Sequence, residues 1–359
     1  MSVIHGLTNP LKELVAKNTI KDALQFIEKH VPINNEQSAI LSTTTVFNIE
    51  NIKQKNNGTV YPSNIINLRK VNNIQRIDDF FFAVNQKLPE KGRFVGCFEP
   101  KNLRKQRILN KYPPVINWIY YFFDFIFKRV FPKVPYLRKI YHFVTLDRNR
   151  VLTKVETFGR LYFSGFKLVD QQEYDSQVFF VAEKVKSYCS DSEPSYGPLC
   201  QLTRNGKDGK PIKVFKIRTM HAYSEFLQEY IYETNKLQDG GKFKDDFRIS
   251  NLGKFLRVFW IDEIPMVLNL LRGELKLVGV RPLSSQYLGL YHEELKQKRA
   301  KVKPGLIPPF YADMPQTLEE IMESEMKYLE AYEKNPLKTD MSYLSKAAKN
   351  ILLKKAKSN

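Results

Sequence analysis

The chain has 359 residues, of which 43% are hydrophobic and 26% are charged. This composition excludes wholesale disorder, and the length favours two domains over one. The 57 Lys and Arg outnumber the 38 Asp and Glu, so the formal net charge is +19. Such an excess predicts an anionic partner: nucleic acid, an acidic membrane surface or a phosphorylated substrate.

The cysteines and the N-terminal sequence indicate in which compartment the protein is expected. Cys97, Cys189 and Cys200 are scattered without C-x-x-C spacing, which argues against a disulfide framework or a zinc site and favours a reducing compartment. The N-terminal sequence lacks the cationic start and apolar core of a signal peptide. No stretch supplies the ~20 apolar residues that a spanning helix needs. We expect no transmembrane helix, while contact with a membrane surface stays open.

Residues 1–100 have the pattern of half an α/β domain. A helix is expected within Thr8 to His30, where apolar residues recur at helical spacing, and another over residues 71–88. The second is followed by the turn Pro89-Glu90-Lys91-Gly92 and by a short strand that starts at Arg93.

This turn-and-strand phrase resembles the second half of class I methyltransferase domains. The later phrase GRLYFSGFKLVD, residues 159–170, resembles the end of the same fold, but the glycine-rich loop that cradles the cofactor is missing. The resemblance implies a degenerate Rossmann-like domain over residues 1–190, kept for structure. An active methyltransferase, which would bind S-adenosylmethionine, is the alternative.

The basic-aromatic segment, residues 101–150, has the most unusual composition in the chain. It carries twelve Lys or Arg against two acids, Asp124 and Asp147. Between Pro113-Pro114 and Pro132 the pattern predicts a helix-length element. Nine aromatic residues lie in or beside it: Tyr112, Trp118, Tyr120, Tyr121, Phe122, Phe123, Phe125, Phe127 and Phe131.

Aromatic residues prefer the bilayer interface, and basic flanks are attracted to anionic headgroups. We therefore expect an in-plane helix on an anionic membrane surface. The alternative is a buried core helix with solvated basic ends. Nucleic acid is not expected as a partner, because no recognisable nucleic-acid module accompanies the segment. The residues expected at the membrane interface are Trp118, Tyr120, Phe122, Phe123, Lys128 and Arg129.

Two adjacent carboxylates, Asp262 and Glu263, lie in an otherwise apolar run within residues 251–282. Burying them is costly unless a cation, a helix end or a metal compensates the charge. Upstream, strands are expected over residues 199–204 and 211–219, joined by a loop with an Asn-Gly turn signal. Lys216 and Arg218 are two residues apart and therefore share one face of the second strand. This face either clamps an anion or is simply solvated.

Five phrases in this half resemble the bacterial sugar transferase family, the monotopic polyprenyl-phosphate sugar-1-phosphate transferases. In order they are GPLCQLTRNGKDGK, FKIRTM, DDFRISNLGKFLR, WIDEIPMVLNLLRGELKLVGVRP and KPGLIPP, and they cover residues 195–310. The resemblance implies a small α+β catalytic domain over residues 191–359 on the cytoplasmic face of the bacterial inner membrane. It also implies transfer of a sugar 1-phosphate from a UDP-sugar to undecaprenyl phosphate, with release of UMP and a requirement for Mg²⁺. Such a step begins the assembly of exopolysaccharide, O-antigen or related glycans.

Carried over to this chain, the resemblance makes Asp262 the nucleophile and Glu263 its partner and metal ligand. The implied phosphate-binding residues are Lys216, Arg218, Arg248, Arg257 and Arg281. The chemistry agrees, since adjacent helical residues point ~100° apart and cannot flank one bond as a glycosidase pair does. They can divide the work between an aspartyl nucleophile and a metal ligand. Pro265 suits a first helical turn, whose positive end would keep Asp262 ionised. The alternative is a structural helix cap.

Three departures from the family pattern stand out. Val280 replaces the proline of the usual Gly-Pro-Arg-Pro phrase, and Ser250 replaces the usual threonine. The family's membrane helix normally comes just before the catalytic domain, yet no such sequence precedes Ser195. The route by which a lipid phosphate arrives is therefore open, as is whether the protein forms a homo-oligomer. The alternative function is a catalytically inactive, membrane-associated scaffold that binds nucleotide.

Overall fold

The computed structural model describes residues 18–33, 37–52, 62–146, 148–187, 194, 196–227, 230 and 246–353. The chain groups into two compact units. Unit 1 comprises residues 1–196 with 222–229, and unit 2 comprises residues 197–221 with 230–359. The predicted domain boundary after residue 190 lies outside the described residues.

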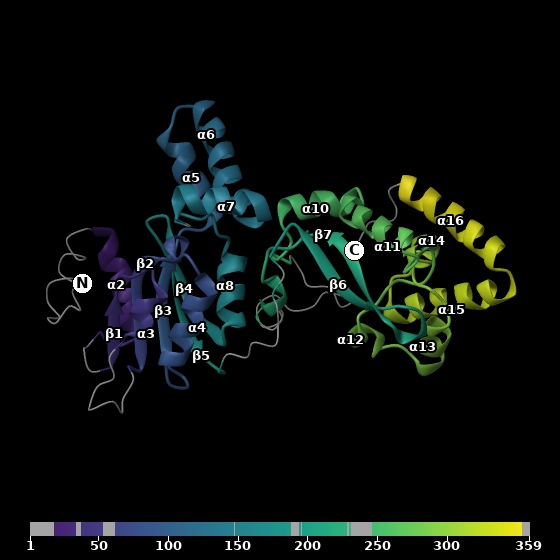
Figure 1. Cartoon of the computed structure of the whole chain (residues 1–359), viewed down its shortest axis with the longest axis horizontal. Coiled ribbons are helices and arrows are strands. Elements are labelled where there is room, and N and C mark those ends of the chain that lie inside the picture. The colour runs from purple at the N-terminus through teal and green to yellow at the C-terminus, as the bar shows by residue number, and fades with distance from the viewer. Residues whose placement is uncertain are drawn as a thin grey trace. The chain divides into compact units, whose positions relative to one another are not determined.

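Unit 1 is built on a five-stranded mixed sheet (Figure 1). The strand order is β1 (Ser38–Leu41), β2 (Asn64–Lys70), β3 (Arg93–Phe98), β5 (Gln177–Lys184) and β4 (Phe166–Tyr174). The first three are parallel, whereas β5 runs antiparallel to both of its neighbours. The accompanying helices are α2 (Asn18–His30), α3 (Val46–Glu50), α4 (Ile77–Lys87) and α8 (Lys154–Phe163). This confirms a mixed α/β architecture, while the methyltransferase-like, Rossmann-like identity stays a prediction.

Alternation along β3 divides the core of unit 1 into two layers. Phe94 and Phe98 face an aromatic cluster with Phe180 and residues of α4 and α8, whose ring centroids lie 5.6–6.4 Å apart. Val95 points the other way and packs in the apolar cluster that α2 covers. The Phe180 ring packs directly on Gly96, where a Cβ would come within 2.7 Å of the ring.

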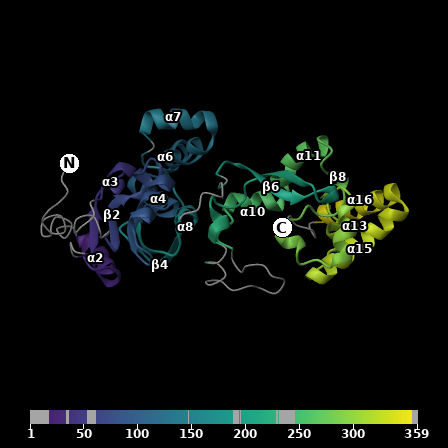
Figure 2. The same ribbon diagram turned by 60° about the horizontal axis from the view of Figure 1, so that its bottom comes forward.

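The basic-aromatic segment forms a helical extension of unit 1 (Figures 1 and 2). It consists of α5 (Lys101–Lys111), α6 (Ile116–Phe125), a π-helical turn (Ile126–Val130), a 3₁₀ turn (Phe131–Lys133) and α7 (Pro135–Thr145). The predicted helix between the prolines is present as α6 with its π-helical turn. Among the described residues, every helix is too short or too polar to cross a bilayer.

Arg104 fixes this extension from inside. Its guanidinium bonds both oxygens of Asp124 at 2.7 and 2.8 Å and Glu99 at 3.1 Å, and all three side chains are buried. Burial alone would raise the pKa of Asp124, but the hydrogen bonds and charge of Arg104, helped by Lys128, lower it. The acid of α6 therefore lies inside the extension, as a carboxylate.

A short piece of the C-terminal half belongs to unit 1. The 3₁₀ turn Ser224–Leu227 and the preceding Tyr223 pack on α8. The Tyr223 hydroxyl donates to Asp78 at 2.5 Å and accepts from Arg160 at 3.0 Å, and the Arg160 guanidinium lies 4.1 Å from the Tyr223 ring centroid. This buried polar cluster holds residues 222–227 within the fold of unit 1.

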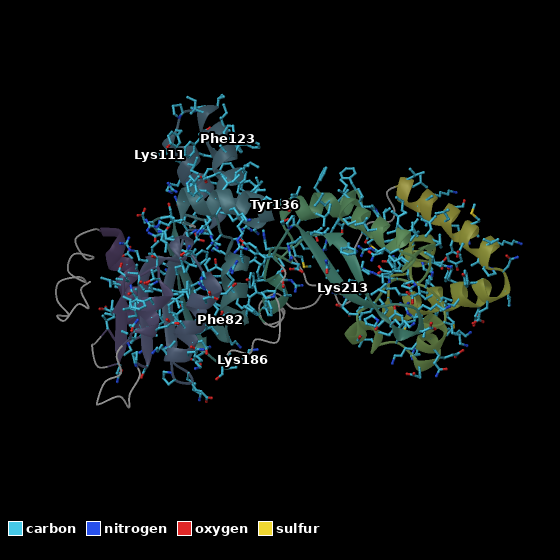
Figure 3. All side chains as sticks on the ribbon, viewed as in Figure 1. Phe82, Lys111, Phe123, Tyr136, Lys186 and Lys213 are labelled. Carbon is cyan, nitrogen blue, oxygen red and sulfur yellow. The ribbon has the colours of Figure 1, made fainter. Side chains whose placement is uncertain are left out.

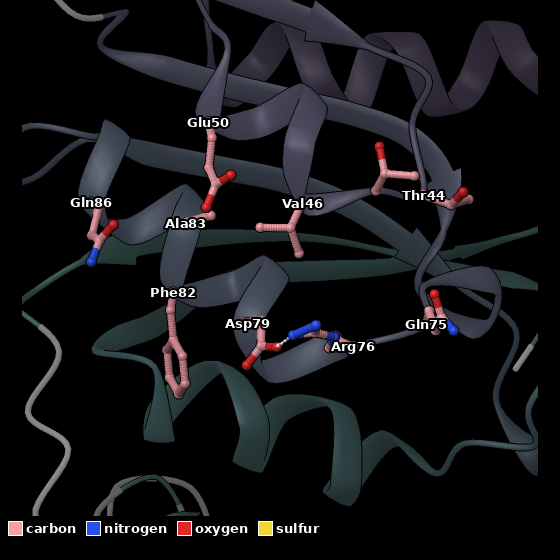
Figure 4. A pocket seen from close by; sticks show the side chains of 10 residues that line it. Thr44, Val46, Glu50, Gln75, Arg76, Asp79, Phe82, Ala83 and Gln86 are labelled. Atoms are coloured by element: carbon pink, nitrogen blue, oxygen red, sulfur yellow. Dashed lines mark hydrogen bonds and ion pairs between the residues drawn. The ribbon is translucent and has the colours of Figure 1, made fainter. Parts of the chain in front are cut away.

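A polar groove lies between α3 and α4 and reaches the loops that follow β1 and β2 (Figure 4). The carboxyl end of a parallel sheet is where ligands commonly bind. Arg76 is paired with Asp79 at 3.1 Å, and Glu50 adds a second acid to the lining. The charges that line the groove therefore do not favour an anionic ligand such as a nucleotide.

Unit 2 is α+β. The predicted strands are present as the antiparallel hairpin β6 (Leu199–Asn205) and β7 (Pro211–Ile217), and β8 (Lys276–Val278) pairs in parallel with β9 (Gly305–Ile307). Within the described part of unit 2 the α-helices are α10 (Asn251–Val258), α11 (Val267–Leu271), α12 (Ser285–Leu288), α13 (Glu293–Ala300), α14 (Phe310–Asp313), α15 (Leu318–Lys334) and α16 (Pro336–Leu352). The largest apolar cluster in the described part of unit 2 joins β8, α13 and α15.

Candidate active site

Helix α10 is anchored to the end of β7 through Thr219. Ser250 caps the helix by accepting from the Gly253 amide at 2.9 Å, and its own amide and hydroxyl donate to the Thr219 carbonyl at 3.0 and 3.1 Å. A Cβ at Gly253 would lie 1.9 Å from that carbonyl oxygen, so glycine permits the close packing. Arg257 Nε then donates to Thr219 Oγ1 at 3.0 Å, which aligns Arg257 with the strand.

The carboxylate pair follows α10 in a sharp turn. Trp260 adopts a left-handed conformation with φ of 60°, and the 3₁₀ turn Ile261–Met266 begins directly after it. Asp262 is 5% exposed and Glu263 is 8% exposed. Met266 packs with Val214 of β7, which fixes the turn against the hairpin.

The two carboxylates differ in their partners. Lys216 Nζ of β7 lies 2.7 Å from Glu263 Oε1. Asp262 Oδ1 is buried and has no hydrogen-bond partner within the described residues. A buried acceptor without a donor is costly unless it serves a function. The geometry therefore separates a paired acid, Glu263, from an acid with a free oxygen, Asp262.

The electrostatic environment of Asp262 makes ionisation of this acid more costly. Burial and the neighbouring Glu263 charge raise the pKa of Asp262, and the cations Lys216 and Arg257 oppose the rise only in part. The sequence predicts that a helix N-terminus favours the ionised form of this acid. Instead the pair lies in a 3₁₀ turn ahead of the five-residue α11, and like charge and desolvation prevail.

Cations gather around the pair from separate elements. Burial lowers the pKa of Arg257, and the nearby charges of Arg281 and Arg248 lower it further, against the influence of Asp262 and Asp246. Arg248 is held by Asp246 in a bidentate pair at 2.7 and 2.9 Å. Lys216, Arg257, Arg248 and Arg281 therefore lie close enough to Asp262 or to one another for their charges to interact. Arg218, also predicted for the site, donates to the Gly197 carbonyl at 2.8 Å.

Arg281 is positioned by residues that the sequence patterns did not single out. Arg299 donates to the Arg281 carbonyl at 2.5 Å and forms a buried ion pair with Glu325 of α15. Burial raises the pKa of Glu325, against the charge of Arg299 and hydrogen bonds from Arg299 and the Arg281 backbone. The Arg281 carbonyl is therefore held by an arginine that is itself fixed in a buried ion pair.

Tyr311 is a second residue that sequence reasoning missed. It is buried, and its ring lies 4.2 Å from Trp260 and 4.3 Å from Phe310, centroid to centroid. Burial, and with it the charges of Glu263 and Asp262, raise the pKa of Tyr311, against the charge of Arg281, so its phenol stays neutral. Its position just after the KPGLIPP phrase is the signal that could have identified it.

The carboxylate pair offers oxygen ligands for a divalent cation. Among the described residues, no three His, Cys, Asp or Glu side chains cluster as metal ligands. The turn offers two carboxylates, one with an unpaired buried oxygen. Mg²⁺ is usually bound by one or two carboxylates together with substrate phosphates and water, so these residues fit that ion.

An exposed apolar surface borders the pair. It follows the outward sides of α10, the 3₁₀ turn and α11, and on each residue 41–79% of the surface is exposed: Leu252, Phe255, Val258, Phe259, Ile264, Val267, Leu268 and Leu271. Apolar residues in such number on one continuous run of chain exceed what a solvated surface normally shows.

The residues predicted for the membrane interface divide into two groups. Trp118, Tyr120, Phe122 and Phe123 are exposed on α6. Lys128 instead pairs with Asp124 at 3.0 Å, and Arg129 is buried against Glu156. These two cations stabilise the interior of unit 1 and do not lie on the exposed face.

Comparison with known proteins agrees with this geometry. Residues 189–354 match the family model described as bacterial sugar transferase. Among curated proteins, the chain is similar to the uncharacterized sugar transferase EpsL of Bacillus subtilis (38% identity, 29% of this chain, 45% of the relative). It is also similar to UDP-glucose:undecaprenyl-phosphate glucose-1-phosphate transferases of Klebsiella pneumoniae (37%, 31% of this chain, 23% of the relative) and Caulobacter vibrioides (36%, 31% and 39%).

Each similarity is confined to part of both proteins. The chain spans less than half the length of these relatives, and the family match leaves out residues 1–188. All five phrases that carry the family pattern lie inside the matched region. Residues 189–354 of this chain belong to the bacterial sugar transferase family.

Proposed function

We propose that the protein transfers a sugar 1-phosphate from a UDP-sugar to undecaprenyl phosphate and releases UMP. The observation that carries this proposal is the buried Asp262, whose unpaired oxygen lies among cations drawn from β7, α10 and the segment after β8. The names of the relatives from Klebsiella pneumoniae and Caulobacter vibrioides support the same reaction class.

The reaction is proposed to proceed by two displacements. An Asp262 carboxylate oxygen attacks the β-phosphorus of the UDP-sugar, the bond from that phosphorus to the UMP oxygen breaks, and UMP leaves with the electron pair. A terminal oxygen of undecaprenyl phosphate then attacks the same phosphorus. The acyl-phosphate bond breaks, the lipid diphosphate sugar forms, and Asp262 is regenerated as a carboxylate.

The surrounding residues have complementary roles in this proposal. Arg257 and Arg281 stabilise negative charge on the phosphoryl oxygens, as cations do in phosphoryl transfer. Lys216 orients Glu263 through their 2.7 Å contact. Mg²⁺, held by Glu263 and the substrate phosphates, would supply further charge neutralisation. The apolar surface on α10 and α11 suits the isoprenoid chain of the lipid. We propose that the reaction takes place at the cytoplasmic face of the inner membrane, as a first membrane step in glycan assembly.

The test uses the purified full-length chain with a sugar-labelled UDP-sugar, first without and then with undecaprenyl phosphate. Without lipid, the wild type should release UMP in a burst stoichiometric with enzyme and retain label as an acyl phosphate that hydroxylamine cleaves. Asp262→Asn should lose both signals and reduce transfer at least ~10³-fold.

Asp208→Asn is the matched control, because Asp208 is an exposed acid in the β6–β7 loop whose left-handed backbone asparagine also tolerates. It should behave as wild type. Wild-type transfer by Asp262→Asn would overturn the assignment of the nucleophile. UMP release that requires lipid, with no labelled protein, would overturn the covalent step. Absence of any UMP release would favour the scaffold.

A further inference from the structure

Helix α6 is oriented with its polar residues inward and its apolar residues outward. Asp124 and Asn117 are buried, the first paired with Arg104 and the second donating to the Leu109 carbonyl at 2.9 Å. The outward residues are 43–64% exposed: Ile116, Trp118, Ile119, Tyr120, Phe122 and Phe123. A helix in water normally shows the opposite arrangement.

Helix α7 continues this pattern. Tyr136, Ile140, Phe143 and Val144 follow helical spacing and are 83%, 50%, 85% and 61% exposed. On the inner side Tyr141 is buried, donates to the Arg148 carbonyl at 2.5 Å and packs its ring 5.7 Å from Phe127. The exposure of the outer residues is therefore a property of a fixed, packed helix.

The charges beside this surface have one sign. Lys111, Arg138 and Lys139 are exposed, and Lys105 lies over the Trp118 ring at 4.6 Å. The acid of the segment that the structure describes, Asp124, is buried and paired. Figure 3 shows Lys111, Phe123 and Tyr136 on this extension of unit 1. The face thus combines exposed aromatic rings with uncompensated positive charge.

We propose that the outer face of α6 and α7 docks in the plane of an anionic phospholipid bilayer. Trp and Tyr side chains favour the headgroup boundary, an apolar helix face gains by partial burial there, and basic side chains add attraction to anionic lipid. A second copy of the chain fits less well, because a symmetric contact would bring Lys111, Arg138 and Lys139 of both copies together. The proposal concerns unit 1 and does not rest on the transfer reaction.

The experiment is cosedimentation of the full-length protein with vesicles that contain neither undecaprenyl phosphate nor UDP-sugar. Vesicles of phosphatidylcholine mixed with phosphatidylglycerol should bind the wild type at least ~10-fold more tightly than pure phosphatidylcholine. Two double variants, Phe122→Ser with Phe123→Ser and Tyr136→Ser with Phe143→Ser, should each weaken binding ~10-fold or more. Lys111→Gln, Arg138→Gln and Lys139→Gln combined should remove the preference for anionic lipid.

Phe47→Ser is the matched control, since Phe47 lies on α3 of the same unit and is 59% exposed. It should bind as wild type, and thermal unfolding should show that all variants remain folded. The proposal is overturned if the protein binds no vesicles or if both double variants bind unchanged, which would place the contact on another surface. It is also overturned if these variants dissociate a dimer of the wild type, which would make a second copy the occupant.

Discussion

At the scale of single residues, the site depends on how burial and charge act on Asp262. The acid is buried beside Glu263, which raises its pKa, while Lys216 and Arg257 compensate only in part. Glu263 keeps a direct ion pair, so the free oxygen belongs to Asp262. Because Oδ1 of Asp262 has no hydrogen-bond donor among the described residues, this oxygen is available to attack a phosphorus atom.

This raised pKa predicts the pH dependence of the first displacement. Only the ionised carboxylate attacks, so activity should fall as pH drops through the pKa of Asp262. Since that pKa lies above the ordinary aspartate value, the acid limb should begin at higher pH than ~3.9. The pH profile of kcat/KM for UMP release measures it. A limb at or below the ordinary value would contradict the assignment.

At the scale of elements, the extension of unit 1 depends on buried ion pairs. Arg104 joins α5 to α6, and Glu156 of α8 is surrounded by Arg129, Lys133 and Arg160. Burial alone would raise the pKa of Glu156, but the three cations together lower it. Because these charged side chains pair with one another inside the extension, the aromatic residues of α6 can lie on its outer surface.

Replacement of Arg104 should test whether these buried ion pairs stabilise the extension. Arg104→Met would leave Asp124 and Glu99 buried with fewer partners, so we expect a loss of about 3–5 kcal/mol in the free energy of unfolding of unit 1. Arg107→Met removes a half-exposed partner of the same Glu99 and should cost about 1 kcal/mol or less. Urea unfolding followed by circular dichroism compares them.

The pH dependence gives a check on the same variant. The lowered pKa of Asp124 contributes stability above its unfolded value, and that stability is lost as pH falls. The difference between wild type and Arg104→Met should therefore shrink in acid. Equal effects of the two substitutions would show that Arg104 does not hold α5 and α6 together.

At the scale of the whole molecule, the chain passes from unit 1 to unit 2, returns to unit 1 for residues 222–229, and then continues in unit 2. Residues 222–227 follow β7 of unit 2 yet pack in unit 1, where Ala222 and Leu227 are fully buried. Tyr223 is the centre of this packing through Asp78 and Arg160. Unit 1 is therefore complete only when the chain beyond residue 221 is present.

Tyr223→Phe should weaken unit 1 selectively. The substitution keeps the ring but removes a hydroxyl bonded to two charged groups, at a cost of about 1.5–3 kcal/mol. Hydrogen exchange in the full-length protein should accelerate in β3 and β5, while β6 and β7 stay unchanged. Tyr136→Phe, at an 83% exposed position, is the control without effect. Acceleration in both units, or in neither, would contradict this role of the hydroxyl.

The sequence by itself determined the features that local pattern encodes. The β6–β7 hairpin follows from two strand-like runs around an Asn-Gly turn, and the helix between Pro114 and Pro132 from its composition and borders. The Asp262-Glu263 pair and its family followed from phrases of fixed spacing. These signals are local because turn chemistry, periodicity and motif spacing act within a few residues.

Tertiary structure decided which distant residues meet. Lys216 and Glu263 are 47 residues apart, and the contact between Arg299 and the Arg281 carbonyl spans 18. Neither pairing has a local signature, because each depends on how β7, α13 and the turn before α11 pack. The same reason explains Lys128 and Arg129, which look like a basic membrane flank in sequence but face buried acids in the fold. Burial of a charge is set by the path of the whole backbone, which no window of sequence contains.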